Sequence, residues 1–139
     1  MNDMSAAKFG IGAPTRRMED QAFVTGHGHY VDDYQPKGVL AAAVLRSPIA
    51  AGTFAITGGL DEARAAPGVK LVLTHDDIAH LGPLPSKGIG PQVDGSPTHV
   101  PPRHILCKDR VRFVGDPVVF IVAETRAAAE DAAELIELD

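Results

Sequence analysis

The stretch Leu81–Pro102 contains four glycines and six prolines among its 22 residues. Neither a helix nor a sheet tolerates that density, because proline lacks a backbone donor and glycine weakens regular structure. The sequence therefore predicts one long loop, with regular structure before and after it. A loop of this length is unusual in a compact domain and is usually functional or flexible. Two interpretations stay open: a mobile loop over the surface, or a docking surface for another domain.

Short apolar runs on both sides of the loop predict strands. Val118–Glu124 is the most apolar of them and is expected to be the central strand, buried on both faces. We expect Thr125 to cap a helix over Arg126–Glu134, and Gly58-Gly59 to open a helix that ends near Ala66. The other expected strands are Val39–Arg46, Thr53–Thr57, Val69–Thr74, Arg103–Cys107 and a closing strand over Leu135–Leu138. Together these elements predict an α+β domain with a mixed sheet, two short helices and the long Pro/Gly-rich loop.

In the first 22 residues the apolar side chains follow neither the spacing of a helix nor that of a strand. Residues 1–22 are therefore expected to form an N-terminal arm that a partner orders. Residues 23–139 are expected to form one domain, because the length of 139 residues matches the usual domain size. The sequence stops at Asp139, within or just after an expected strand. We therefore expect this chain to be a piece of a longer protein.

Composition excludes several classes of partner and location. The chain has 13 Lys+Arg against 18 Asp+Glu, whereas nucleic-acid binding requires clustered basic residues. Its longest apolar runs, Val39–Leu45 and Val118–Ala123, fall far short of the ~18 residues that indicate a membrane span. The N-terminal residues do not resemble a secretory signal. The single cysteine, Cys107, cannot form an internal disulfide, which fits a reducing compartment, so we expect a cytoplasmic protein.

The six histidines are candidate metal ligands. His27 and His29 are separated by one residue, so on a strand both would point to the same face. The remaining histidines gather around the Pro/Gly-rich loop with three acidic residues: His75, His80, His99 and His104, and Asp76, Asp77 and Asp94. Their spacing is irregular and no Cys-x-x-Cys accompanies them, which favours ordinary hydrogen-bonded side chains over a metal site. A free-standing module that binds a metal or small ligand through this His/Asp-rich loop is the alternative hypothesis.

Other candidates for chemistry have simpler structural interpretations. Cys107 with the nearby His104 has the residue types of a nucleophile and its base, but a lone buried thiol is the favoured interpretation. The adjacent carboxylates of Asp32-Asp33 and of Asp76-Asp77 diverge on a strand, which favours capping or turn roles. Gly115-Asp116-Pro117 predicts a turn that feeds the central strand, with an interdomain contact as the alternative. We therefore assign no catalytic, cofactor-binding or metal-ligating residue.

Taken in order, four motifs resemble one known family. They are RRMEDQAFVTGHGHYVDD, LAAAVLRSP, LDEARAAPGVKLVLTHDD and VRFVGDPVVFIVAETRAAAEDAAELIELD. This series resembles the N-terminal part of the large subunit of molybdenum hydroxylases, the relatives of xanthine dehydrogenase, aldehyde oxidase and carbon monoxide dehydrogenase. The most specific part of the resemblance is the last motif, in which the strand VRFVGDPVVFIVAET is followed by the helix AEDAAEL.

The resemblance implies an α/β hammerhead fold and a context in a larger enzyme. In that family the large subunit carries molybdopterin, while [2Fe–2S] clusters and FAD reside on partner domains or subunits. The residues that hold molybdenum lie beyond this segment, so none is carried over. The resemblance implies a non-catalytic structural or interface domain. Its parent enzyme would oxidise or hydroxylate aldehydes, N-heterocycles or a small substrate such as carbon monoxide. The expected partners are the remainder of the large subunit and the iron–sulfur and FAD subunits or domains.

Overall fold

A computed structural model of the chain describes residues 17–86 and 90–139. The chain divides into two compact units, Met1–Gly38 and Val39–Asp139. The described part of the first unit contains the short helix α1 (Asp20–Val24) and the 3₁₀ helix η1 (Val31–Asp33). Residues 1–16 of the expected arm lie outside the described residues. Helix α1 runs across residue 22, so regular structure begins before the boundary that the sequence suggested.

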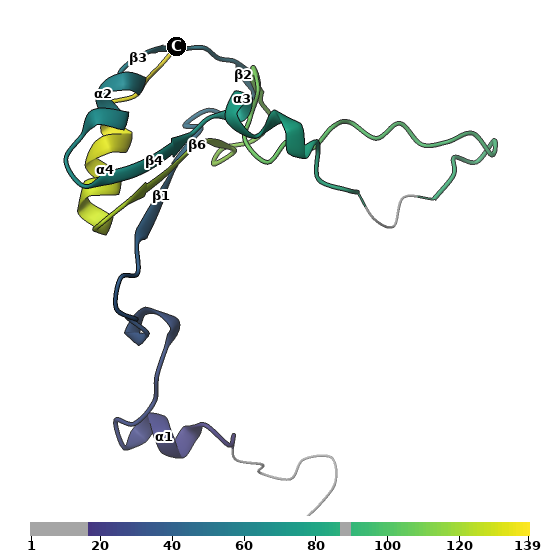
Figure 1. Ribbon diagram of the computed structural model, residues 1–139. Coiled ribbons are helices and arrows are strands. Elements are labelled where there is room, and N and C mark those ends of the chain that lie inside the picture. The colour runs from purple at the N-terminus through teal and green to yellow at the C-terminus, as the bar shows by residue number, and fades with distance from the viewer. Residues whose placement is uncertain (1–16, 87–89) are drawn as a thin grey trace, which may run out of the picture. The chain divides into compact units, whose positions relative to one another are not determined.

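The second unit carries small sheets and short helices. In chain order its elements are β1 (Ala41–Arg46), β2 (Gly52–Thr53), β3 (Ile56–Gly58), α2 (Leu60–Ala65), β4 (Val69–Leu73), α3 (His75–Ile78), η2 (Ala79–Leu81), β5 (Arg110–Val111), β6 (Pro117–Ala123), α4 (Arg126–Glu134) and β7 (Glu137–Leu138). The strands form a three-stranded sheet in the order β1-β6-β4 and two two-stranded sheets, β2-β5 and β3-β7. Helix α4 packs on β1 and β6, and α2 packs on β4 (Figure 1). This arrangement confirms the α+β class.

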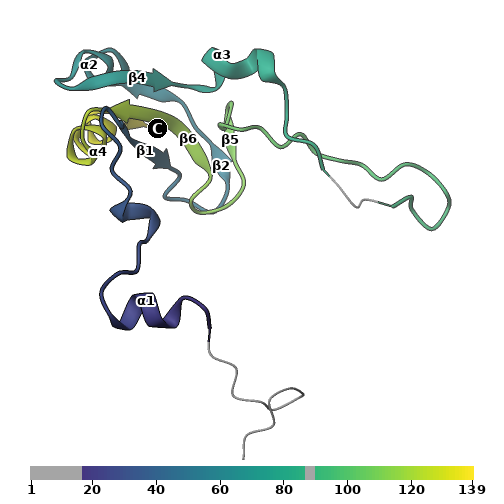
Figure 2. The same ribbon diagram turned by 60° about the horizontal axis from the view of Figure 1, so that its bottom comes forward.

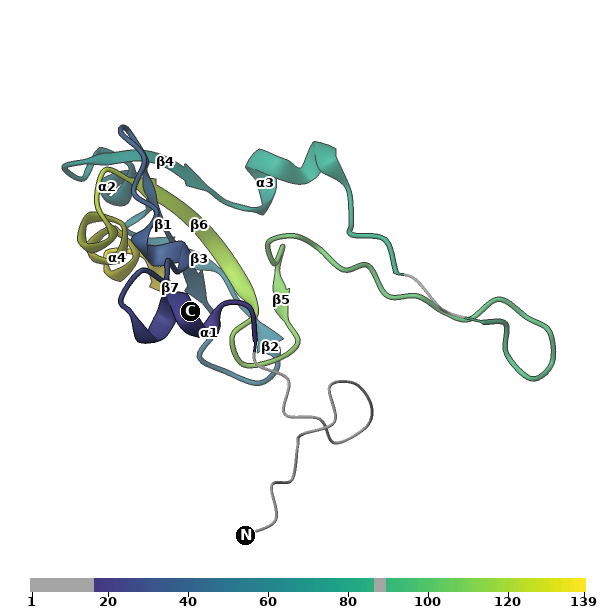
Figure 3. The same ribbon diagram turned by 90° about the horizontal axis from the view of Figure 1, so that it is seen from below.

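The direction of the strands differs from the expected mixed sheet. Every strand pair among the described residues is antiparallel. The prediction treated each strand–helix–strand segment as a crossover that returns to the same sheet, which makes parallel neighbours. Instead, α2 connects β3 to β4 and α4 connects β6 to β7, so each helix links the three-stranded sheet to the separate β3-β7 pair (the helices and β6 in Figure 2, β3 and β7 in Figure 3).

Strand β6 is central, as predicted, because it pairs with β1 on one side and with β4 on the other. Leu45 pairs with Val119 and Arg46 with Pro117, which leaves Val118 as an extra residue in β6. Such a β-bulge places two residues opposite one, and here both Val118 and Val119 reach the core, with exposures of 1% and 0%. Pro117 stands at the first position of the strand, where its missing N–H is tolerated.

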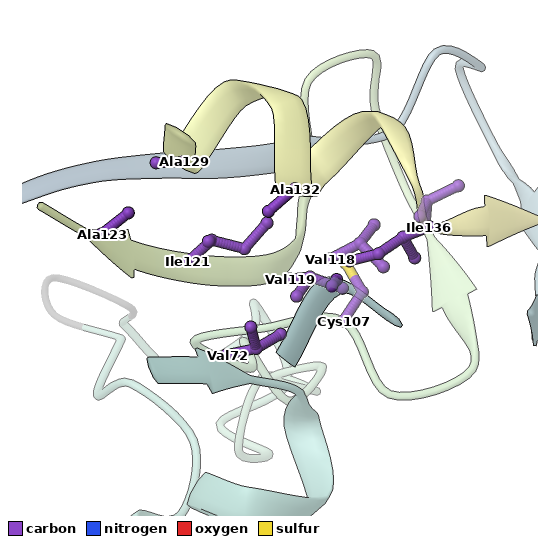
Figure 4. Close-up of a cluster of buried hydrophobic side chains, with 11 residues drawn as sticks. Val72, Cys107, Val118, Val119, Ile121, Ala123, Ala129, Ala132 and Ile136 are labelled. Carbon is purple, nitrogen blue, oxygen red and sulfur yellow. The ribbon is translucent and has the colours of Figure 1, made fainter. Parts of the chain in front are cut away.

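The core lies between the three-stranded sheet and the helices (Figure 4). Ile121 of β6 points toward α4, and the small side chains Ala129 and Ala132 of that helix are fully buried in the same cluster. The hydroxyl of Thr125 accepts a hydrogen bond of 3.1 Å from the N–H of Ala128, which confirms its role as the N-cap. Alanines on the buried side allow the helix to lie close to the sheet.

The long loop carries no helix or strand over residues 82–86 and 90–102, in agreement with its glycine and proline content. Figure 3 shows it leaving the domain after η2 and returning before β5. Its ends are joined by an isolated bridge in which the N–H of Leu84 donates to the carbonyl of Arg103 at 2.8 Å. The strand expected over Arg103–Cys107 is therefore wrong beyond this bridge. Pro101, two residues before Arg103 and therefore on the same edge, lacks the N–H group that the next pair of this ladder would need.

Candidate interaction surface

One face of the three-stranded sheet is apolar, and it lies opposite to the face on which α4 packs. Successive residues of a strand point to opposite faces, so the register assigns one set of side chains to the face away from α4. We call this set the outer face: Ala42, Val44, Leu71, Leu73, Phe120 and Val122. The neighbours on the other face, such as Ile121 and Val72, are buried in the core at 0% and 5% exposure.

The outer face is only partly buried. Val44, Phe120 and Val122 are half-buried, and Leu71 is 45% exposed. A groove of about 360 Å³ lies over one part of it, at Val44, Leu73 and Phe120, and is bordered by apolar side chains from the segments before and after the long loop. The bordering residues are Ile78, Leu81, Ile105 and Leu106. A contiguous apolar groove on a protein surface is characteristic of an interaction site.

The turn Gly115-Asp116-Pro117 fixes one end of this groove. Gly115 adopts a φ of +88°, a conformation that glycine permits, and its carbonyl accepts a hydrogen bond of 2.9 Å from Nη1 of Arg46. The Oδ2 atom of the buried Asp116 accepts a hydrogen bond of 2.9 Å from the N–H of Arg112. The carbonyl of Pro117 accepts a hydrogen bond of 2.8 Å from the N–H of Cys107, so both ends of the turn are bonded within the domain. This is the turn into the central strand that the sequence predicted.

The structure brings together two of the six histidines. The rings of His75 and His104 meet edge to face, with centroids 4.8 Å apart. Nδ1 of His75 lies 3.1 Å from the carbonyl oxygen of Leu106, which can only accept, so Nδ1 carries the proton. In the same unit His80 and His99 are exposed, and in the first unit His27 contacts Thr25 at 3.1 Å and His29 is exposed outside any strand.

Cys107 does not share a pocket with His104, the residue considered above as its base. A pocket of about 260 Å³ has His75, Asp76 and Cys107 in its wall, but not His104. Burial and the hydrogen bond to the Asp116 carboxylate raise the pKa of the Cys107 thiol to about 12. The thiol is therefore protonated at neutral pH, and a protonated thiol is a poor nucleophile.

The candidate acidic ligands bind nearby backbone and hydroxyl groups instead. Asp33 accepts a hydrogen bond of 2.8 Å from the N–H of Tyr30, next to Asp32 in η1. Hydrogen bonds from the backbone N–H and hydroxyl of Thr74 lower the pKa of Asp77. Hydrogen bonds from the hydroxyl and N–H of Ser96 lower the pKa of Asp94 in the same way. For Asp33 and Asp77 these are the capping and turn roles that the sequence favoured.

Two kinds of site find no support in residues 17–86 and 90–139. No group of three or more His, Cys, Asp or Glu side chains is placed to hold a metal ion there. Within the same ranges, none of the helices has the length and apolar character needed to cross a membrane.

Sequence reasoning missed the outer face. The continuous apolar run of β6 indicated a strand covered on both faces, whereas Phe120 and Val122 are only half-buried. A signal exists in the flanking strands, because Ala42 and Val44 of β1 and Leu71 and Leu73 of β4 alternate with the residues of the core. That alternation identifies two apolar faces but not which of them the helices cover.

Comparison with known proteins assigns the fold to a family. The family model described as "Aldehyde oxidase and xanthine dehydrogenase, a/b hammerhead domain" matches residues 25–139. This chain belongs to that family. The hammerhead domain and the resemblance to molybdenum hydroxylase large subunits are thereby confirmed.

Individual relatives of the hammerhead domain are much longer than it is. It is 41% identical over 131 residues to the nicotine 6-hydroxylase large subunit of Paenarthrobacter nicotinovorans, covering 93% of this chain and 15% of the relative. It is 34% identical over 123 residues to the xanthine dehydrogenase molybdenum-binding subunit of Escherichia coli O157:H7, covering 88% of this chain and 16% of the relative. The solved structure of quinoline 2-oxidoreductase from Pseudomonas putida 86 matches with a TM-score of 0.70 and 38% identity, covering 90% of this chain and 15% of that one.

Proposed function

We propose that this domain is a non-catalytic structural and interface domain in the large subunit of a molybdenum-dependent oxidoreductase. The observation that carries the proposal is the apolar outer face with its groove, on a chain that matches 15% of the nicotine 6-hydroxylase large subunit. Apolar surface of this kind is stabilised by a cover that removes it from water. In a protein of that length the remainder of the large subunit supplies the cover.

The side chains of the domain itself do not fit a molybdenum cofactor. His75 and His104 supply two imidazoles, and no third ligand joins them among the described residues. The Cys107 thiol is buried and its pKa is raised to about 12, which opposes a thiolate ligand. The proposal therefore places molybdopterin elsewhere in the large subunit and [2Fe–2S] clusters and FAD on partner domains or subunits.

We further propose that the full-length enzyme that contains this domain hydroxylates an N-heterocycle and that it resides in the cytoplasm. Two proteins similar to this chain are named for nicotine and quinoline, which both contain a nitrogen heterocycle. Aldehydes and carbon monoxide are the other substrate classes in the wider family. The unpaired, buried Cys107 supports a reducing compartment.

Metal analysis tests the proposal directly. The full-length large subunit, produced with its partner subunits, is expected to contain stoichiometric molybdenum and to oxidise N-heterocycles. Purified residues 1–139 are expected to contain none and to lack activity. Stoichiometric molybdenum in the purified segment, or turnover by it, would contradict a non-catalytic role.

A metal-binding module is the second candidate, because His75 and His104 lie in contact. Calorimetric titration with zinc distinguishes it from a structural domain. Saturable one-to-one binding that is lost in His75→Ala would favour the module, with the exposed His99 replaced by Ala as the matched control. The structural domain is expected to show no saturable binding, either in the wild type or in the two variants.

A further inference from the structure

The pairing between β3 and β7 has a register shift between Ile56 and Gly58, and from Ile56 it continues regularly to Asp139. Ile56 pairs with Leu138, and Ala55 then exchanges two backbone hydrogen bonds with Asp139, each 2.9 Å long. Hydrogen-bonded and non-hydrogen-bonded pairs alternate in an antiparallel ladder. A residue following Asp139 in the same strand would therefore stand opposite Phe54 in a non-hydrogen-bonded pair, where opposing side chains lie closest.

The chain before Ala55 can extend the ladder with β7, because the backbone groups of Thr53 face the same edge. The N–H of Phe54 donates to the carbonyl of Asp109 at 3.0 Å, on the β5 side, whereas the N–H and C=O of Ala55 face β7. Because backbone groups of alternate residues in a strand point to the same edge, Thr53 faces the β7 edge as Ala55 does. A continued β7 would thus pair next with Thr53.

A pocket of about 120 Å³ opens where that next side chain would lie. Its wall is largely apolar: Phe54, Val111 and Val118 contribute to it, together with Ile49 and Leu138. Val111 and Val118 are 2% and 1% exposed, so the floor of the pocket is core, whereas Ile49 at the rim is 48% exposed. The hydroxyl of Ser47, which also lines it, donates to the carbonyl of Ile49 at 2.9 Å. The pocket therefore suits an apolar side chain.

The alternation along β7 directs the following side chain into this pocket. Ile136 is buried and Leu138 is half-buried, whereas Glu137 and Asp139 are exposed. With a period of two, the residue after Asp139 falls on the inner face that Leu138 occupies. Leu138 and Phe54 both pack against the core cluster, and both line the pocket.

We propose that, in the full-length protein, the segment immediately after Asp139 continues β7 along Phe54 and Thr53, and that its first side chain is apolar and fills this pocket. The inference rests on the proposed function only in requiring a longer chain, which the 15% coverage of the nicotine 6-hydroxylase large subunit supports. The domain is thus closed by its own continuation. A strand from a second copy is the competing occupant, but it would bear the entropic cost of association, which a residue already held in register does not.

Engineered disulfides in the full-length large subunit test this placement. One cysteine replaces the residue that follows Asp139, and Phe54→Cys supplies its partner. Non-hydrogen-bonded pairs have Cα atoms about 4.5 Å apart, within the usual range for a disulfide. We expect an intramolecular disulfide, identified by mass spectrometry of the linked peptides. The matched control combines the same new cysteine with Ala55→Cys, whose side chain points to the opposite face, and is expected to give none.

Ile56→Cys with Leu138→Cys, a pair that exists in the structure, shows that bridges form under the conditions used. Failure of the Phe54→Cys bridge beside a successful Ile56→Cys bridge would overturn the inference, and so would a bridge found only between two copies. Hydrogen exchange of the unmodified full-length protein gives a second test, because the Thr53 amide is expected to be protected like that of Ala55. Rapid exchange at Thr53 would contradict the placement. None of these measurements depends on molybdenum content, so the proposed function and this inference can fail separately.

Discussion

At the scale of single residues, Asp77 is a candidate metal ligand whose carboxylate instead caps the start of α3. It accepts hydrogen bonds from the N–H of Thr74 at 2.7 Å and from its hydroxyl at 2.8 Å, and these bonds lower its pKa. A lowered folded-state pKa means that the stabilisation is present above the unfolded-state pKa and is lost as pH falls through the folded-state value.

We expect Asp77→Ala to reduce the free energy of unfolding at neutral pH by about 0.5–2 kcal/mol, the usual effect of losing a cap. The difference between wild type and variant should shrink as the pH falls below the ordinary range of an aspartate. Urea denaturation at several pH values measures it. The adjacent, exposed Asp76 provides the control, since Asp76→Ala removes a carboxylate without removing the bonds to Thr74. Equal losses in both variants would contradict the capping role.

Cys107 is predicted to be chemically inert in the folded domain. Burial first, and then the carboxylate of Asp116, raise the pKa of its thiol to about 12. Because the pKa of the thiol is higher in the folded than in the unfolded state, the protonated thiol contributes to the stability of the fold. This contribution is present below the thiol's unfolded-state pKa and is lost as the pH rises toward the folded-state value. We expect iodoacetamide to label Cys107 slowly in mildly alkaline buffer and rapidly after unfolding by urea, as measured by mass spectrometry. Equally rapid labelling of the folded protein would show an activated thiolate.

At the scale of elements, the two faces of β6 predict different responses to the loss of an apolar side chain. Ile121 is fully buried between the sheet and α4, so Ile121→Ala is expected to cost about 2–5 kcal/mol of stability. Val122, the next residue, lies on the outer face and is half-buried, so Val122→Ala is expected to cost clearly less. Chemical denaturation of the two variants compares them. A loss below about 0.5 kcal/mol for Ile121→Ala would show that the core is misplaced.

Local signals predicted individual elements better than their assembly. The helix α4 is predicted with its bounds, Arg126–Glu134, because Thr125 caps it and small apolar residues recur on one side. The strand expected over Thr53–Thr57 is divided between β2 and β3, since one half pairs with β5 and the other with β7. Pairing partners depend on contacts between residues that are distant in sequence, and apolar periodicity carries no information about them. The mixed sheet was expected for the same reason.

At the scale of the whole molecule, the candidate surface is harder to predict than the fold. The turn at Gly115-Asp116-Pro117 and the capping role of Asp77 follow from local residue chemistry, and the structure has both. The outer face does not follow from it, because β6 is apolar on both sides and only the packing of α4 decides which side is covered. The pairing of His75 with His104 likewise depends on the closure of the long loop.

The outer face makes a prediction for the full-length protein that a matched pair of leucines can test. Leu71 lies on the outer face and Leu135 lies beyond it, at the end of α4, and both are 45% exposed. If the rest of the large subunit covers the outer face, Leu71→Ser leaves a polar side chain in a buried interface, whereas Leu135→Ser changes only a surface residue. We expect Leu71→Ser to lower the yield of assembled enzyme and its thermal midpoint, and Leu135→Ser to leave both near the wild-type values. Size-exclusion chromatography and thermal denaturation measure the two effects. Equal behaviour of the variants would mean that the outer face stays exposed to water in the full-length protein.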